Sequence, residues 1–233
     1  MGAEKEQSIE GGSMSRSASG SGLGKLFVEA GKLIGEFPII LIPAVIPAFW
    51  QFIAPRIGLI NPAAVLSIGY IGFGAGAWRL LGYSLIYVIF LAVSQGATVA
   101  LVRDASKQGS VRLYGSLEEA VSKFVPLIVA SLLTGLIVSV ASLFFLFPAL
   151  VAAFFLWYIV QGVMIDSASG ITALRASFRF SATYAGETFA VILATLVVSF
   201  AFSFIPYVGW LLMIPTTAYF AALTTLLYLG REA

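Results

Sequence analysis

Long apolar runs are the feature of this sequence that most restricts its fold. Of its 233 residues, 60% are hydrophobic and only 10% are charged, against roughly 25% charged in a soluble domain. The apolar residues are gathered in runs of about twenty, the length of a helix that crosses ~30 Å of hydrocarbon. The other fold that satisfies backbone groups in lipid is a closed barrel, whose strands alternate apolar and polar residues. These runs do not alternate, so the sequence predicts an all-α integral membrane protein.

We expect six transmembrane helices arranged as three helical hairpins. The predicted spans cover residues 38–54, 80–102, 125–145, 149–165, 187–204 and 208–229. Pro38, Pro43 and Pro47 are expected to kink the first span, and neighbouring helices must then satisfy the carbonyls that they free. Residues 147–148 and 205–207 are expected to form the tight turns of the last two hairpins.

The segment 58–76 is apolar but rich in glycine, which weakens a helix, so we predict that it does not cross the membrane. With six spans, the cytoplasmic side holds eleven of the thirteen Lys and Arg, and only Arg56 and Arg79 lie outside. A seventh span in this segment would divide the cations five to eight. The positive-inside rule therefore favours six spans with both termini cytoplasmic.

The two ends of the chain lie outside the predicted membrane domain. Residues 1–23 are mainly Gly, Ser and Glu, and this composition predicts a disordered cytoplasmic tail. The membrane domain is expected to cover residues 24–229 and to lie in the cell membrane. Residues 230–233 are expected to form a cytoplasmic C-terminus.

A short amphipathic helix is expected on the cytoplasmic surface before each hairpin. The first has charged residues on one face and an apolar set on the other: Leu26, Ala30, Leu33, Ile34 and Phe37. The second is expected to open at Ser116, because Ser116-Leu117-Glu118-Glu119 has the S-x-x-E form of a capping box. Its Glu119 is expected to pair with Lys123, four residues later.

The third short helix covers residues 170–181 and carries the only charges between two long apolar runs. As a helix, it places Ile171, Leu174 and Phe178 along one side. Arg175 and Arg179, four residues apart, lie along another side. This pattern is typical of a helix that lies in the cytoplasmic face of a bilayer, with its cations at the level of the lipid phosphates.

A local match between the second and fourth spans supports an internal repeat. The second span contains Gln95-Gly96 and ends at Asp104, and the fourth contains Gln161-Gly162 and ends at Asp166. Internal repeats are common in membrane folds, and transporters are only one class that uses them.

The run from Arg103-Asp104 through Gly115 to Ala120, followed by residues 170–181 before another span, resembles a group of poorly characterised six-helix prokaryotic membrane families. One of them is the membrane domain attached to some glycerophosphodiester phosphodiesterases. The similarity covers roughly residue 97 to the C-terminus. It implies the membrane topology alone, because the phosphodiesterase itself is a separate soluble barrel with histidines and metal-binding carboxylates, for which this chain has no room.

Composition and motifs argue against catalysis. The chain has no cysteine and no histidine, which removes thiolate chemistry, the commonest general base and the commonest metal ligand. No ionisable residue is expected at membrane depth, and no phosphate-cradling loop, metal-spaced cluster or nucleic-acid surface is present. We therefore expect no enzyme, no cofactor and no nucleic-acid partner.

Two sets of residues are candidates for a functional site. A basic cytoplasmic belt would contact anionic lipid headgroups or an acidic partner, unless its cations only fix topology: Lys25, Lys32, Lys123, Arg175 and Arg179. A polar path would be lined by amides and helix-end carboxylates: Gln51, Gln95, Gln161, Asp104 and Asp166. The alternative for these amides is helix–helix hydrogen bonding, and for these carboxylates it is pairing with Arg103 or Arg175 or capping of a turn.

Two functional hypotheses follow. The first is a non-catalytic integral membrane protein that interacts with membrane lipids or a membrane-protein partner at its cytoplasmic face. The second is a small permease or transporter subunit whose site lies between the helical repeats.

Overall fold

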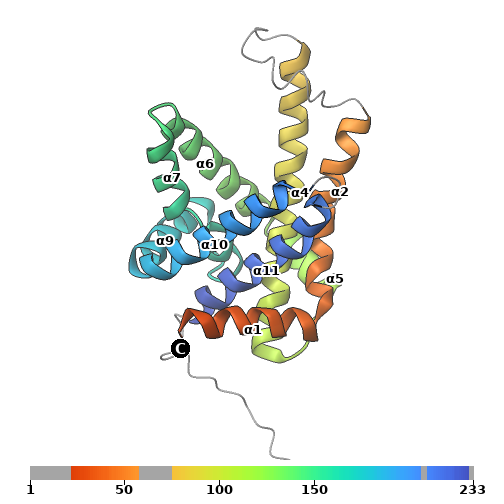
Figure 1. Cartoon of the computed structure of the whole chain (residues 1–233), viewed down its shortest axis with the longest axis vertical. Coiled ribbons are helices and arrows are strands. Elements are labelled where there is room, and N and C mark those ends of the chain that lie inside the picture. The colour runs from red at the N-terminus through yellow and green to blue at the C-terminus, as the bar shows by residue number, and fades with distance from the viewer. Residues whose placement is uncertain (1–21, 58–74, 206–208, 231–233) are drawn as a thin grey trace, which may run out of the picture.

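The computed structural model describes residues 22–57, 75–205 and 209–230, and within these ranges the regular structure is helical (Figure 1). In chain order the helices are α1 (Leu23–Glu36), η1 (Pro38–Leu41), α2 (Ile42–Arg56), α4 (Ala75–Gln108), α5 (Leu113–Ser122), α6 (Phe124–Ser142), α7 (Leu146–Phe155), α8 (Ile159–Met164), α9 (Gly170–Thr183), α10 (Ala185–Ser203) and α11 (Gly209–Leu229). The predicted all-α class is confirmed. Segment 58–76 falls outside the described residues, except that Ala75 and Gly76 begin α4.

Within the described ranges, five helical stretches are long and apolar enough to cross a membrane: Gly82–Gln108, Phe124–Ser142, Leu146–Met164, Ala185–Phe202 and Leu211–Leu229. A sixth is reached only if α1 and residues 38–54 are counted together, although they meet at an angle of 100°. These helices indicate a multi-pass membrane protein.

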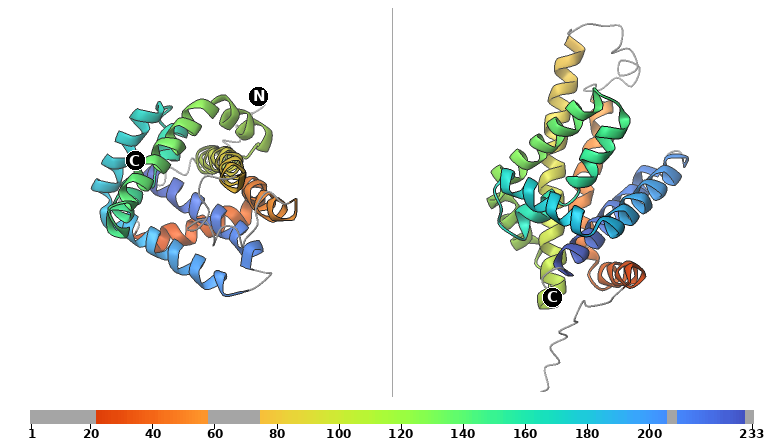
Figure 2. Two further views of the ribbon diagram at one scale, coloured as in Figure 1. Left: turned by 90° about the horizontal axis from the view of Figure 1, so that it is seen from above. Right: turned by 90° about the vertical axis from the view of Figure 1, so that its left-hand side faces the viewer.

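The long helices pack as three hairpins, α2 with α4, α6 with α7, and α10 with α11, which splay apart toward their tips (Figures 1 and 2). A short helix precedes each hairpin in the chain: α1, α5 and α9. By connectivity the short helices lie at the open ends of the hairpins, opposite the tips. The order of elements therefore follows the predicted one.

Helix α1 packs its apolar face on α11 as the periodicity predicts. Ala30 and Leu33 are buried, and the Tyr219 hydroxyl of α11 donates a hydrogen bond to the Phe27 carbonyl at 2.9 Å. The helix ends at Phe37, which has φ −126° and ψ 71°. A residue before proline is driven out of the α region, so Pro38 causes the 100° bend between α1 and α2.

The prolines of α2 act as expected on the backbone. Pro47 has no N–H, so the carbonyl of Pro43, four residues earlier, loses its partner within the helix. The Ser94 hydroxyl of α4 donates to this carbonyl at 2.6 Å, and Ser94 is buried. A neighbouring helix thus satisfies the group that the proline frees.

Helix α4 is longer than the predicted span 80–102. Its 34 residues correspond to about 51 Å at ~1.5 Å per residue, more than the ~30 Å hydrocarbon core. Arg103 and Asp104, expected to end the span, lie inside the helix, which continues to Gln108.

The predicted capping box at Ser116 is wrong. Helix α5 begins three residues earlier, at Leu113, and Ser116 lies buried in its interior with no hydrogen-bond partner for its hydroxyl. The Glu119 side chain does not reach back to the helix start, because it binds Arg103 of α4. A tertiary ion pair therefore competes successfully with the local cap.

The fourth predicted span is present with an interruption in its helix, and its hairpin turn lies elsewhere than expected. Helix α7 ends at Phe155 and α8 begins at Ile159, so the predicted span 149–165 matches the stretch Leu146–Met164 that is long and apolar enough to cross a membrane, but its helix is interrupted at residues 156–158. The turn before α7 falls at residues 143–145, and Pro148 lies in the first turn of α7. A proline is tolerated in a first turn because the backbone N–H groups there have no intrahelical acceptor.

Equivalent glycine contacts support the internal repeat. A Cβ on Gly96 of α4 would lie 3.4 Å from the Ala120 Cβ of α5 and 2.9 Å from a Leu127 methyl group. A Cβ on Gly162 of α8 would lie 3.4 Å from the backbone of Ala173 in α9. In both hairpins, the glycine of the Gln-Gly pair thus allows the second helix to approach the short helix that follows it.

Candidate functional site

The basic residues predicted to form a belt divide into two groups. Lys25 and Lys32 of α1 and Arg175 and Arg179 of α9 are exposed. Lys123 is not available in the same way, because its ammonium group lies 3.0 Å from a Glu119 oxygen and donates to the Met164 carbonyl at 2.8 Å. Met164 is the last residue of α8, where carbonyls lack an intrahelical donor. The prediction that Lys123 contacts headgroups is therefore replaced by an internal role at the end of α8.

Helix α9 has three distinct faces. Its protein-facing side consists of small residues and one aromatic residue, all buried: Gly170, Ala173, Ser177, Phe180 and Ser181. The predicted apolar side faces away from the rest of the protein, since Ile171 is 70% and Phe178 51% exposed, while Leu174 is half-buried. The two arginines lie farther round the helix from the protein-facing side.

This three-way division gives α9 one side against the protein, one exposed apolar side and one exposed cationic side. A Cβ on Gly170 would lie 2.7 Å from a Val129 methyl group and 3.2 Å from the Ala130 nitrogen of α6, so the start of α9 is seated directly on α6. The Phe178 ring stacks on Phe155 with centroids 4.4 Å apart. The helix is therefore held in a fixed orientation.

An ion cluster joins α4 and α5. The Arg103 guanidinium donates to the Asp104 carboxylate at 2.9 Å and to the Glu119 carboxylate at 2.7 Å and 2.9 Å. Glu119 also binds Lys123, so that predicted pair is confirmed. The hydrogen bond from Arg103 lowers the pKa of Glu119 below its ordinary value, against the opposing effect of burial. This cluster fixes the short helix α5 to the end of the longest helix.

The two aspartates that were predicted to lie at helix ends are each bound to another side chain. Asp104 pairs with Arg103, one of the expected partners. Asp166 accepts a hydrogen bond from the Tyr228 hydroxyl of α11 at 2.7 Å, a contact that the sequence does not predict. Tyr228 was missed because a tyrosine near the end of an apolar run is ordinarily an interfacial residue.

The three glutamines do not line one path. Gln161 is buried in α8 and donates to the Thr224 hydroxyl of α11 at 3.0 Å, the helix–helix hydrogen bond given as the alternative. Gln51 is exposed and donates to the Tyr87 hydroxyl at 2.7 Å. Gln95 is half-buried in α4, beside the close contact of Gly96.

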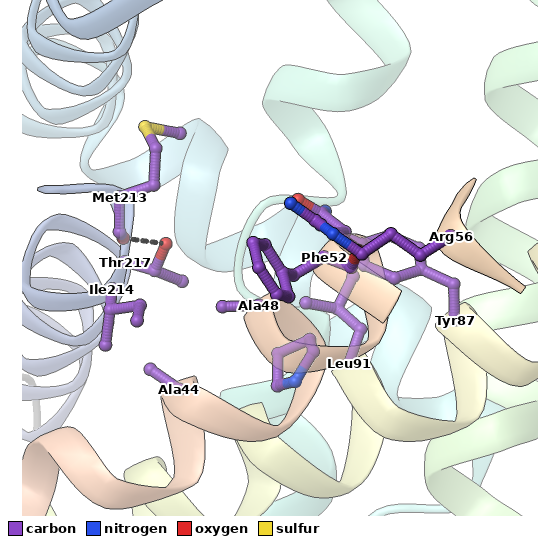
Figure 3. Close-up of a pocket in the computed structure, with 11 residues that line it drawn as sticks. Ala44, Ala48, Phe52, Arg56, Tyr87, Leu91, Met213, Ile214 and Thr217 are labelled. Carbon is purple, nitrogen blue, oxygen red and sulfur yellow. Dashed lines mark hydrogen bonds between the residues drawn. The ribbon is translucent and has the colours of Figure 1, made fainter. Parts of the chain in front are cut away.

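A cavity of about 460 Å³ lies between α2, α4 and α11 (Figure 3). It is lined by Gln51, Arg56 and Tyr87, by Thr217 of α11, and by the apolar residues Ala44, Pro47, Ala48, Phe52, Leu91, Met213 and Ile214. Gln95, Gln161, Asp104 and Asp166 are not among the lining residues, so the proposed polar path is not assembled here. Arg56 and Tyr87 were missed as a pair because residues 31 positions apart carry no sequence signal of proximity.

Among the described residues, no group of three or more His, Cys, Asp or Glu side chains could hold a metal ion. No family model matches the chain, and no curated protein or solved structure is significantly similar to it. The resemblance to the six-helix prokaryotic families therefore stays a prediction.

Proposed function

We propose that this chain is a non-catalytic multi-pass protein of the cell membrane that binds anionic lipid headgroups at its cytoplasmic face. In this arrangement α1, α5 and α9 lie on the cytoplasmic side, both termini are cytoplasmic, and the hairpin tips point outward. The predicted positive-inside distribution of Lys and Arg supports this orientation.

The observation that carries the proposal is the geometry of α9. A helix at a membrane surface needs one side against apolar chains and cations at the level of the phosphates. The exposed side chains of Ile171 and Phe178 supply the first requirement, and Arg175 and Arg179 supply the second. Neither arginine is ion-paired with another described residue, in contrast to Lys123.

The test is lipid preference measured on the purified protein. Arg175→Ala/Arg179→Ala removes two cations and leaves the buried side of α9 intact. Each cation near an anionic surface contributes ~1 kcal/mol, so the preference for phosphatidylglycerol over phosphatidylcholine should fall by on the order of 2 kcal/mol at low salt. The difference should shrink as salt screens it.

Lys123→Gln is the matched control, because it removes a cation that the fold already uses. It should weaken the fold and leave lipid preference unchanged. If the double arginine variant keeps its full preference, the basic residues serve topology alone and the proposal fails.

The permease hypothesis is less well supported. Its predicted site lies between the repeats, near Gln95, Gln161 and the prolines of the first span, and both amides adjoin glycines at close helix contacts. Pro47 is among the residues that line the cavity. The remaining support for this hypothesis is the cavity that contains Gln51.

A further inference from the structure

The cavity between α2, α4 and α11 has one polar end and one apolar end (Figure 3). Arg56 and Tyr87 lie together at one end, while Ala44, Ile214 and Met213 lie toward the other. Thr217 adds no free donor at the apolar end, because its hydroxyl donates to the Met213 carbonyl at 2.7 Å. The cavity is therefore amphipathic along its length.

A single stripe of α2 produces this gradient. Ala44, Ala48, Phe52 and Arg56 follow one another at intervals of four residues and so lie on one side of the helix. The small side chains of Ala44 and Ala48 leave room beside α2. Twelve residues of helix cover about 18 Å, close to the ~15 Å depth of one leaflet of a ~30 Å hydrocarbon core.

The polar end presents a fixed cation. The Arg56 guanidinium carbon lies 3.4 Å from the centroid of the Phe52 ring, and one of its N–H groups donates to the Phe52 carbonyl at 2.6 Å. Its other N–H groups remain in the fork geometry that binds phosphate oxygens. No lining residue is acidic, so nothing among the described residues of the cavity wall neutralises this charge.

A second donor lies beside the arginine. Gln51 donates its amide N–H to the Tyr87 oxygen, which leaves the Tyr87 hydroxyl hydrogen free to donate to a ligand. A cation and a hydroxyl donor at one end, followed by an apolar groove one leaflet deep, match the headgroup and acyl chain of one phospholipid.

We infer that the α2/α4/α11 cavity binds an anionic glycerophospholipid, with its phosphate at Arg56 and Tyr87 and one acyl chain along Ala48 and Ala44. The polar end of this site lies at the tip of the α2/α4 hairpin, and its apolar end reaches the first turn of α2, toward α1. The site is independent of the proposed headgroup binding by Arg175 and Arg179.

The experiment is a lipid titration of the delipidated full chain in maltoside detergent, with bound lipid counted by native mass spectrometry. Dioleoylphosphatidylglycerol should bind more tightly than dioleoylphosphatidylcholine. Arg56→Gln should weaken phosphatidylglycerol binding about fivefold, the equivalent of one surface cation. It should weaken phosphatidylcholine binding less, because the choline cation offsets the charge of that lipid's phosphate. Ala48→Phe fills the groove and should weaken the binding of both lipids.

Two matched variants serve as controls. Arg112→Gln removes an exposed cation at the start of α5 that belongs to neither proposed site, and Val45→Phe places the same phenyl side chain at a residue of α2 that lines a different, apolar groove. The whole series is repeated in the Arg175→Ala/Arg179→Ala background, so that binding at the cavity is measured apart from binding at α9. In that background, both controls should bind lipid as tightly as the background chain itself.

Three results would overturn the inference. The first is that the unaltered chain binds phosphatidylglycerol and phosphatidylcholine equally tightly. The second is unchanged phosphatidylglycerol binding by Arg56→Gln in the double-arginine background. The third is full competition by glycerol 3-phosphate, which has no acyl chain and would identify the ligand as a free phosphate.

Discussion

The backbone N–H of Tyr158 donates a hydrogen bond to the Ser177 hydroxyl, 3.1 Å away, across the break between α7 and α8. The same hydroxyl donates to the Phe155 carbonyl at 2.8 Å. One completely buried side chain of α9 thus bridges the two backbone groups at the interruption. This relationship explains how an apolar helix can be broken without leaving these groups unsatisfied.

Ser177→Ala should therefore destabilise the protein by roughly 1–3 kcal/mol, the cost of leaving buried polar groups without partners. The matched control is Thr183→Ala, which removes an exposed hydroxyl of the same helix that donates only to the Arg179 carbonyl one turn earlier, and it should have little effect. Chemical unfolding in detergent provides the measurement. Equal stability of the two variants would contradict the bridging role of Ser177.

The contact between Ser94 and Pro43 predicts a compensating pair of substitutions. Ser94→Ala removes the donor to the Pro43 carbonyl and should cost roughly 1–3 kcal/mol. Pro47→Ala restores a backbone N–H four residues after Pro43, which can donate to the same carbonyl. In a double-mutant cycle, Ser94→Ala should therefore cost less in the Pro47→Ala background. Strict additivity would show that the serine does not serve the proline.

Acid should weaken the attachment of α5 through Glu119. Its pKa is lowered in the fold, chiefly by the hydrogen bond from Arg103, relative to the ordinary value of 4.5. A lowered pKa stabilises the fold above the unfolded value, and this contribution is lost as pH falls through the folded pKa. Stability should therefore decline on acidification below about pH 4.5.

Glu119→Gln should be less stable than the unaltered chain at about pH 7 and should lose less stability on acidification. Glu118→Gln, at the exposed neighbouring position, should keep the original pH profile. Thermal unfolding between about pH 3 and pH 7 measures both. An unchanged acid dependence in Glu119→Gln would assign the acid sensitivity to other carboxylates.

Periodicity predicted the elements that pack by their apolar faces. The hydrophobic side of α1 and the Glu119–Lys123 pair were found because both depend on residues three or four positions apart. The order of hairpins and short helices was predicted from the lengths of the apolar runs.

Tertiary contacts decided what the sequence did not predict. The buried side of α9 includes Gly170, Ala173 and Ser177. These small residues contribute little to a hydrophobic pattern but allow the neighbouring helices to approach α9 closely. The sequence around Ser116 has the form of a capping box, but Glu119 binds Arg103 of α4 and does not take part in a cap. In the same way, Lys123 resembles a free surface cation until the end of α8 is placed beside it.

The central claim is that the short helices share one side of the membrane and the hairpin tips the other. The chain lacks cysteine, so single cysteines can report sidedness without background. Three exposed positions are suitable: Gln108 at the end of α4, Gly186 at the start of α10 and Ser142 at the end of α6. In intact cells and in inverted vesicles, a membrane-impermeant maleimide should label cysteines at 108 and 186 only from the cytoplasm, and a cysteine at 142 only from outside. Labelling of positions 108 and 186 from opposite sides would contradict the three-hairpin account.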